Sequence, residues 1–194
     1  NIDLVKKERK AEHTSLNFIR LGTSGSLQGD IPVDSILASS HGLGLDGLLH
    51  FYEDSEPFTH NDFIDRFIEE SGWNTCFARP YLAEAGDALF QKADGFINGI
   101  PATACGFYGP QGRTLKLKVK EPLLNEKLTA FQHHHLRITN FEMETSAIYG
   151  LSKLMGHQAL SVNTIIANRI TGEFSKDYKK AVKEMIEQVL DRFV

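Results

Sequence analysis

The stretch Phe141-Glu-Met-Glu-Thr-Ser146 decides the fold. A predicted strand at 137–140 precedes it and a helical pattern at 147–154 follows it, so it marks a strand-to-helix junction. Residues two apart in extended backbone point to one side, which brings the carboxylates of Glu142 and Glu144 together. α/β folds place ligands at such junctions. A sugar diol would suit this pair, because each hydroxyl can donate a charge-assisted hydrogen bond to a carboxylate oxygen.

Strand and helix patterns alternate on both sides of this junction. Strands are expected over 17–21, 35–40, 100–108 and 160–167, and helices over 59–71, 84–93, 122–133 and 181–193. The last helix has the clearest pattern, with apolar residues at i, i+3 and i+4 throughout. Such alternation predicts helices packed on the faces of a central sheet. We therefore expect one domain over residues 1–194, a three-layer α/β/α sandwich with a mixed central sheet.

Composition and charge narrow the function classes. The 194 residues carry 21 basic and 25 acidic side chains, a formal net charge of −4, which argues against a nucleic-acid surface. The densest basic run, at 116–120, alternates with apolar residues, as on the solvent face of a strand. An apolar run of about eighteen residues is lacking, so no transmembrane helix is expected, and no signal peptide is recognised. Two cysteines, Cys76 and Cys105, form no disulfide framework, which favours a cytoplasmic protein.

A Gly-rich segment, Arg20-Leu-Gly-Thr-Ser-Gly25, follows the first predicted strand. We interpret it as a tight turn that aims several backbone N–H groups at one point and forms an anion nest. Thr23 adds a hydroxyl, and the guanidinium of Arg20 suits phosphate. The alternative is a turn that needs Gly22 and Gly25 only for their backbone angles. The Lys-Ser/Thr ending of a Walker A loop is absent.

A second polar segment, Phe107-Tyr-Gly-Pro-Gln-Gly-Arg113, follows the strand expected at 100–108. An amide and a guanidinium two residues apart can face the same way in extended backbone. Gln111 can pair with N3–H and one carbonyl of uracil while Arg113 donates to the other carbonyl, and Phe107 could stack on the ring. The alternative is a polar surface loop.

Arg169 follows the buried strand expected at 160–167, and a charged residue at the carboxyl end of a strand is well placed for a site. The polar segment 170–177 after it could be a mobile lid. The alternative is a solvent-facing loop with no role in a site.

Two further motifs are interpreted as having no function. Gly42-Leu-Gly-Leu-Asp-Gly47 matches the dinucleotide-binding pattern, but polar residues and Pro57 stand where the long helix should follow. The triple His133-His-His135 lies near a predicted helix end, and no Asp, Glu or Cys has zinc-like spacing from it. We expect a solvated helix end there, and no metal site.

Four segments taken together resemble the nucleoside phosphorylase family and, within it, the uridine phosphorylases. They are RLGTSG at 20–25, GFYGPQGR at 106–113, NFEMET at 140–145 and IIANR at 165–169, in the family's order and with similar separations. The Glu-Met-Glu signature marks the wider family, and the Gln-x-Arg pair marks its pyrimidine branch. The resemblance runs from residue 17 to the C-terminus.

The resemblance implies a phosphate and ribose end of the site. Phosphate would be held by Arg20, Gly22 and Thr23, and Thr23 would also lie near the ribose. Met143 and Glu144 would bind the ribose, with Glu144 on its 2′ and 3′ hydroxyls.

The resemblance also implies a base end. Gln111 and Arg113 would read uracil, with Phe107 packing beside it and Arg169 supporting the same end. Glu142 would sit behind the base and orient Gln111 or Arg113. Catalysis would rest on Gln111 and Arg113, together with Glu144 at the ribose.

The implied reaction is reversible phosphorolysis of uridine to uracil and ribose 1-phosphate, through an oxocarbenium-like ribose. Inorganic phosphate would be a co-substrate, and no cofactor or metal would be needed. A homo-oligomer, either a dimer or a hexamer built of dimers, is implied as well. Purine-selective relatives and nucleosidases carry an acidic residue where this chain reads Ala167-Asn-Arg169. A purine nucleoside phosphorylase or a nucleosidase is therefore the weaker alternative.

The family's N-terminal portion, which carries a Gly-Asp-Pro-type phosphate loop, has no counterpart in this sequence. The chain begins at Asn1 rather than Met, within a helix-like stretch at 3–12. We expect either a fragment of a longer protein or a truncated relative. A truncated relative could keep a nucleoside pocket without being an enzyme.

Overall fold

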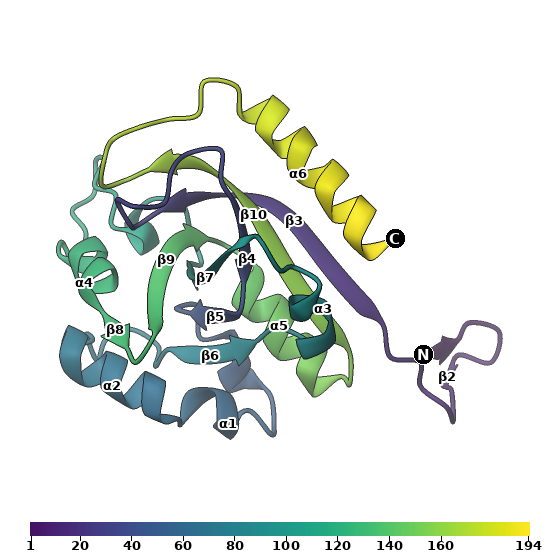
Figure 1. Ribbon diagram of the computed structural model, residues 1–194. Helices are drawn as coiled ribbons and strands as arrows, with labels where there is room; N and C mark the ends of the chain where they lie inside the picture. Colours follow the sequence, from purple (N-terminus) through teal and green to yellow (C-terminus); the bar gives the residue numbers. More distant parts are fainter.

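The computed structural model describes residues 1–194 (Figure 1). The strands are β1 (Ile2–Asp3), β2 (Glu8–Arg9), β3 (Asn17–Ser26), β4 (Ile36–Ser39), β5 (His41–Gly44), β6 (Tyr81–Glu84), β7 (Ile97–Thr103), β8 (Gln132–His133), β9 (Leu136–Glu142) and β10 (Gln158–Asn168). The α-helices are α1 (Glu56–Thr59), α2 (Asp62–Ser71), α3 (Asp87–Gln91), α4 (Leu124–Ala130), α5 (Thr145–Leu154) and α6 (Tyr178–Phe193). Two short 3₁₀ helices are η1 (Leu48–Phe51) and η2 (Gly109–Gln111).

The central sheet has eight strands in the order β6-β5-β7-β4-β10-β3-β9-β8 and is mixed, as the sequence predicts. β3 runs parallel to β10, and β7 runs parallel to β4, β5 and β9, whereas β4 with β10 and β3 with β9 are antiparallel. The extra pairing of β7 with β9 closes β4, β10, β3, β9 and β7 into a ring. This closure brings the carboxyl ends of β7 and β9 side by side.

Helices cover the sheet on both sides, which confirms the predicted α/β architecture (Figure 1). α5 packs on β5, β6 and β10, and α6 packs on β10 and β3. Ala181, Met185 and Val189 of α6 are buried, whereas Ile186 and Leu190 on the flank of the predicted apolar stripe are exposed. Burying a side chain such as Met185 contributes about 1.5–3 kcal/mol. The buried apolar residues of α6 therefore hold this helix against the sheet.

The N-terminal segment departs from the prediction. The helix-like stretch at 3–12 instead forms the small hairpin β1–β2, which stands away from the body of the molecule (Figure 1). The Asp3 carboxylate accepts hydrogen bonds from the backbone N–H groups of Val5 and Lys6, and Lys7 adopts a left-handed φ of 56°. This local turn competes with a helix, because a short Asp side chain can satisfy the nearby backbone donors.

The Gly-rich segment after the first strand also differs from the prediction, because it is not a turn. β3 continues through Ser26, and β10 pairs with it along its length, with Asn163 opposite Gly22 and Thr164 opposite Thr23. The anion nest predicted from this segment is therefore wrong. The non-local pairing with β10 outweighs the local preference of glycine for turns.

Other boundaries shift for local reasons. The helix expected at 59–71 divides at Asn61, whose side chain accepts from the backbone N–H of Ile64 and caps α2. The helix expected at 84–93 is the end of β6 followed by α3, with Gly86 at the boundary. The run at 116–120 is an exposed loop and no strand, and β7 ends at Thr103.

The dinucleotide-like glycines have a packing role. Gly42 lies in β5, where a Cβ atom would collide with the backbone of Ser146 at the start of α5. The short 3₁₀ helix η1 follows this segment, at the place where the dinucleotide-binding pattern has a long helix.

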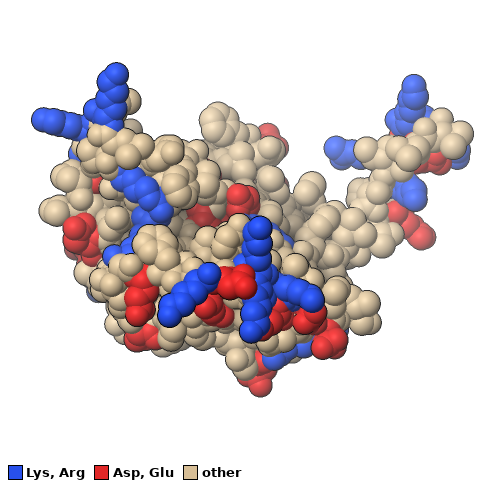
Figure 2. Space-filling model, turned by 90° about the horizontal axis from the view of Figure 1, so that it is seen from above, with Lys and Arg blue, Asp and Glu red and all other residues tan.

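Seen from above, the molecule presents interspersed blue and red side chains on this face (Figure 2). α6 contributes ion pairs at i, i+4 spacing, Lys180 with Glu184 and Lys183 with Glu187.

None of the helices is both long enough and apolar enough to cross a membrane.

Candidate active site

A cavity of about 480 Å³ lies where the middle of β3 meets the carboxyl end of β9 and the last residues of β10. It collects side chains from five segments that are distant in the sequence. Every residue that the sequence predicts for the site lines this cavity: Arg20, Gly22, Thr23, Phe107, Gln111, Arg113, Glu142, Met143, Glu144 and Arg169. Ser24, Gly25, Phe141, Ile166, Ala167 and Phe174 complete the lining.

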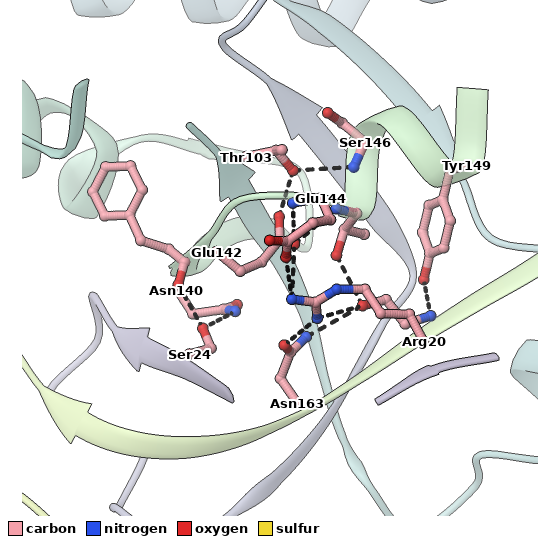
Figure 3. Close-up of polar contacts among 12 residues, drawn as sticks. Arg20, Ser24, Thr103, Asn140, Glu142, Glu144, Ser146, Tyr149 and Asn163 are labelled. Carbon is pink, nitrogen blue, oxygen red and sulfur yellow. Dashed lines mark hydrogen bonds and ion pairs between the residues drawn. The ribbon is translucent and has the colours of Figure 1, made fainter. Parts of the chain in front are cut away.

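Glu142 is the buried anchor of the junction between β9 and α5 (Figure 3). One carboxylate oxygen accepts from the hydroxyl of Thr103, its register partner on β7. The other accepts from the backbone N–H groups of Glu144 at 2.8 Å and Thr145 at 2.7 Å. Glu142 thus satisfies the free N–H groups at the start of α5, where a negative charge is also favoured by the helix dipole. The expected contact with Gln111 or Arg113 is not formed.

The guanidinium of Arg20 lies against the two carboxylates of the junction (Figure 3). Its guanidinium pairs with Glu144 and lies 3.7 Å from a carboxylate oxygen of Glu142. On its other side it donates to Asn163 Oδ1 at 2.7 Å and to Ser161 Oγ at 3.3 Å, both on β10. This arrangement fixes a cation beside the two carboxylates at one end of the cavity, and only part of its donor set stays free.

Gly22 makes room for that cation. A Cβ atom at this position would collide with the guanidinium of Arg20, which lies over the strand. Gly22 therefore lets the guanidinium of Arg20 lie close to the strand. The sequence suggests a different reason for this glycine, the backbone angles of a turn. The hydroxyl of Thr23, one residue further on, makes no hydrogen bond within the protein.

Gln111 is buried at the opposite end of the cavity, held by two arginines. Arg113 donates to its amide oxygen at 2.6 Å. Arg169 donates to the same oxygen and, at 3.0 Å, to the backbone carbonyl of Gln111. Both lone pairs of the amide oxygen are thus engaged, and the amide NH₂ remains as the unused polar group.

The two guanidiniums also stack on aromatic rings. Arg113 lies over Phe107, 3.9 Å from the ring centroid, and Arg169 lies over Phe141 at 4.6 Å. The ring faces stabilise the cations where water is scarce. Phe107 is therefore in contact with Arg113, and both line the cavity.

Burial lowers the pKa values of the guanidiniums of Arg113 and Arg169. Burial and, as a smaller effect, the positive charge of Arg113 together lower the pKa of Arg169 to about 10. Burial also lowers the pKa of Arg113. Both remain cations at neutral pH, and Nε of Arg169 is a buried donor without a partner. This end of the cavity is therefore suited to a planar group with carbonyl oxygens that gain negative charge.

Some supporting residues were missed by the sequence reasoning. Ser161 and Asn163 interrupt the apolar run of β10 and accept hydrogen bonds from Arg20. Their sequence signal is a polar residue inside a buried strand, because buried polar groups need partners. Thr103 ends β7 beside Glu142, and only the pairing of β7 with β9 reveals its role.

The segment 170–177 folds back over the cavity. The backbone N–H of Asn168 donates to Glu173, and that of Ser175 donates to Ile166. Phe174 lines the cavity and is otherwise exposed. This placement agrees with a segment over the site, and its predicted mobility stays a prediction.

A larger groove of about 780 Å³ lies on the other side of Arg113 and is mostly apolar. Trp73, Phe77 and the loop at 115–121 form its walls. Glu142 and Glu144, the carboxylates of the first cavity, do not line this groove.

The histidine tract also differs from the prediction. His133 ends β8, and His134 and His135 form the turn into β9, so the tract is a hairpin and no helix end. No acidic residue has zinc-like spacing from the tract in the sequence, but the fold brings Asp62 Oδ2 to 2.9 Å from His133 Nε2.

Known proteins share this sequence pattern. A uridine phosphorylase of Thermococcus kodakarensis is 28% identical over 169 residues, which are 84% of this chain and 52% of that protein. A uridine phosphorylase of Haemophilus influenzae is 25% identical over 165 residues, 82% of this chain and 57% of that protein. The chain therefore spans little more than half the length of these curated relatives.

Solved structures share the fold. A nucleoside phosphorylase of Trypanosoma brucei, described as showing uridine phosphorylase activity, matches with a TM-score of 0.81 at 24% identity, over 98% of this chain and 71% of that one. A uridine phosphorylase structure from the oomycete Phytophthora capsici matches with a TM-score of 0.65 at 18% identity, over 98% and 72% of the two chains. The sequence model of the phosphorylase superfamily matches residues 2–194, nearly the whole chain. The chain accordingly belongs to the phosphorylase superfamily.

Proposed function

We propose that this chain carries the nucleoside site of a phosphorylase that splits uridine with inorganic phosphate into uracil and ribose 1-phosphate. One observation carries the proposal: a single cavity has Gln111 held by two arginines at one end and the Glu142–Glu144 pair with Arg20 at the other. The first end suits a base with adjacent carbonyls and an N–H, and the second suits a ribose diol and an anion. The curated relatives named as uridine phosphorylases support the same assignment.

At the base end, the free NH₂ of Gln111 donates to one uracil carbonyl. The N3–H of uracil needs an acceptor, and the amide oxygen of Gln111 is occupied by Arg113 and Arg169. When Arg113 turns from this oxygen to the second uracil carbonyl, one lone pair is released for N3–H. Arg169 keeps its hold on the backbone carbonyl of Gln111 and so keeps the amide in place.

At the sugar end, Glu144 accepts from the 2′ and 3′ hydroxyls, and Met143 packs against the ribose. Glu144 is half exposed and already pairs with Arg20, so binding of the diol replaces part of that pair. Arg20 then shares its charge with phosphate, which also reaches the free hydroxyl of Thr23. The absence of a side chain at Gly22 leaves room for the guanidinium that would hold the anion.

The chemistry follows from the two ends. The glycosidic bond stretches first, which leaves positive charge on the ribose and negative charge on the uracil carbonyls. Fixed donors aimed at such developing charge contribute about 3 kcal/mol each in a dry site. Phosphate attacks C1′ from the opposite face, the C1′–N1 electron pair leaves with uracil, and uracil takes up a proton. The step needs no cofactor.

One observation bears on each of two alternative functions. A purine nucleoside phosphorylase or a nucleosidase would need an acid beside the base, and the chain ends β10 with Ala167-Asn-Arg169, without a carboxylate. A protein that binds nucleosides without splitting them is favoured by the ion pair of Arg20 with Glu144, because this pair engages the cation proposed to hold phosphate. A homo-oligomer, a dimer or a hexamer of dimers, would complete the phosphate end from a second copy.

The test is uracil release from uridine by absorbance, with and without phosphate. Release that depends on phosphate supports phosphorolysis, and release without it supports hydrolysis. Inosine in place of uridine tests the purine alternative. Binding of uridine without release, measured by calorimetry, would support a protein that binds nucleosides without splitting them. Arg66→Ala, which removes an exposed guanidinium of α2, serves as the matched control for the arginine variants below.

A further inference from the structure

The hairpin turn between β8 and β9 brings two histidines against the first residue of α2. Figure 1 shows β8 between α4 and α2, away from the carboxyl end of β9. His133, His134 and Asp62 each offer one ligand atom, and these three atoms lie within 4.8 Å of one another. None of the three residues lines the cavity of the candidate active site.

The donor set fits a divalent transition metal. Zn²⁺ binds imidazole nitrogen at about 2.0–2.1 Å and carboxylate oxygen at about 2.0–2.2 Å, commonly with four ligands in a tetrahedron. Donors around such an ion stand about 3.3 Å apart, a spacing that follows from these bond lengths. The distance from Asp62 Oδ2 to His133 Nε2 is 2.9 Å and the widest spacing is within 4.8 Å, so small side-chain rotations reach it.

Two of the ligands are held in place by the fold. His133 is mostly buried, and its ring packs edge-on against Phe63 at 5.9 Å between centroids. Asp62 opens α2, whose start is fixed by the capping side chain of Asn61, and its own carboxylate is exposed. The fold thus positions the ring of His133 and the backbone of Asp62 before an ion binds.

The ion pair between Asp62 and His133 does not explain the position of His134 beside them. Its φ is 53°, in the left-handed region that favours glycine or asparagine at a hairpin turn. Its ring lies 4.2 Å from that of His133 between centroids, and its imidazole makes no hydrogen bond or ion pair within the chain. Backbone strain of this kind persists where a side chain is needed in one place.

We propose that Asp62, His133 and His134 bind one Zn²⁺ ion, with water in the fourth position. The ion links the start of α2 to the hairpin that leads into β9, the strand that ends at Glu142. Its role is to stabilise the fold, because binding that occurs only in the folded state raises stability. His135, the next residue of the turn, lies outside the ligand set.

Calorimetric titration of the metal-free 194-residue protein with zinc chloride tests this assignment. The informative variant is His134→Gly, which removes the imidazole and keeps a residue that accepts the left-handed φ. His135→Ala is the matched control from the same turn. We expect one Zn²⁺ per chain, a loss of affinity of about a hundredfold in His134→Gly, and an unchanged affinity in His135→Ala.

A second measurement is the melting temperature with and without Zn²⁺. We expect the ion to raise it in the parent protein and in His135→Ala, and to leave it unchanged in His134→Gly and Asp62→Asn. Absence of Zn²⁺ binding to the parent would overturn the proposal. An equal loss in His134→Gly and His135→Ala would also overturn it, because zinc would then be binding the tract without the predicted ligand set. Neither measurement depends on uridine turnover.

Discussion

Arg169, which directly follows β10, donates two hydrogen bonds to Gln111. One goes to the backbone carbonyl of Gln111 at 3.0 Å and the other to its side-chain amide oxygen. The two residues come from segments far apart in the sequence, and this double contact ties the η2 turn to the central sheet. The amide is therefore oriented by the sheet before any ligand is bound. Preorganisation of this kind lowers the cost of aligning a base.

Arg169→Lys should impair the reading of uracil more than the binding of the sugar. An ammonium group makes a single point contact and cannot hold the backbone carbonyl and the amide oxygen together. We expect kcat/KM for uridine to fall roughly thirtyfold, or about 2 kcal/mol. The affinity for ribose 1-phosphate, measured by calorimetry, should change little. An equal loss in both would mean that Arg169 supports the whole cavity.

Arg113→Ala should remove a donor that acts on the leaving uracil. Loss of one such donor costs about a hundredfold or more in kcat. Ribose 1-phosphate carries no base, so its affinity should stay close to that of the parent. The control Arg66→Ala should leave both quantities unchanged. If turnover and ribose 1-phosphate binding fell together, the leaving-group role of Arg113 would be wrong.

Glu144→Gln should change the affinities for two ligands in opposite directions. The variant loses the charge that accepts from the ribose hydroxyls, so ribose 1-phosphate and uridine should bind about tenfold more weakly. It also frees Arg20 from its ion-pair partner, so inorganic phosphate alone should bind at least as tightly as before. Calorimetry with each ligand separates the two effects. Equal turnover of uridine and 2′-deoxyuridine by the parent protein would count against recognition of the 2′-hydroxyl by Glu144.

Features set by local sequence could be predicted. The i, i+3, i+4 spacing places Met185 and Val189 of α6 in the core, and the helical pattern after the carboxylates predicts α5. Alternation of strands and helices predicts the sandwich. The residues of the candidate site were found because polar side chains stand at strand ends, and because their motifs resemble a known family.

Features that depend on distant pairing could not be predicted. Gly22 and Gly25 have the local signature of a turn, but pairing with β10, and at Gly25 also with β9, keeps them extended. The closure of the sheet depends on β7 meeting β9, a contact that leaves no trace in either strand alone. The role of Glu142 as the partner of Thr103 and the cap of α5 follows from that closure.

Thr103→Val should destabilise the fold through Glu142. The hydroxyl of Thr103 donates to the buried carboxylate and accepts from the backbone N–H of Ser146 at 3.0 Å. Valine keeps the shape and leaves both groups unsatisfied, which costs about 2–3 kcal/mol of unfolding free energy. For a chain of this size the melting temperature should fall by about 5–10 °C. Thr114→Val, on the exposed loop, should leave the melting temperature unchanged.

His41 should make stability depend on pH. Burial in β5 lowers its pKa below the ordinary value of 6.5, and the charges of His135 and Lys153 act in the same direction, against the opposing effect of Glu84. The folded protein therefore resists protonation of His41, and the unfolded chain binds the proton more readily. Because the unfolded state binds more protons in this window, the unfolding free energy rises with pH there.

The stability that His41 contributes is thus fully present above pH 6.5 and is lost as the pH falls through the lowered pKa of the folded state. His41→Gln should flatten this part of the profile, measured by denaturant unfolding at a series of pH values between about 7.5 and 5. His13→Gln, at an exposed position near the N-terminus, should keep the slope of the parent. An unchanged slope in His41→Gln would assign the acid sensitivity of the fold to other groups.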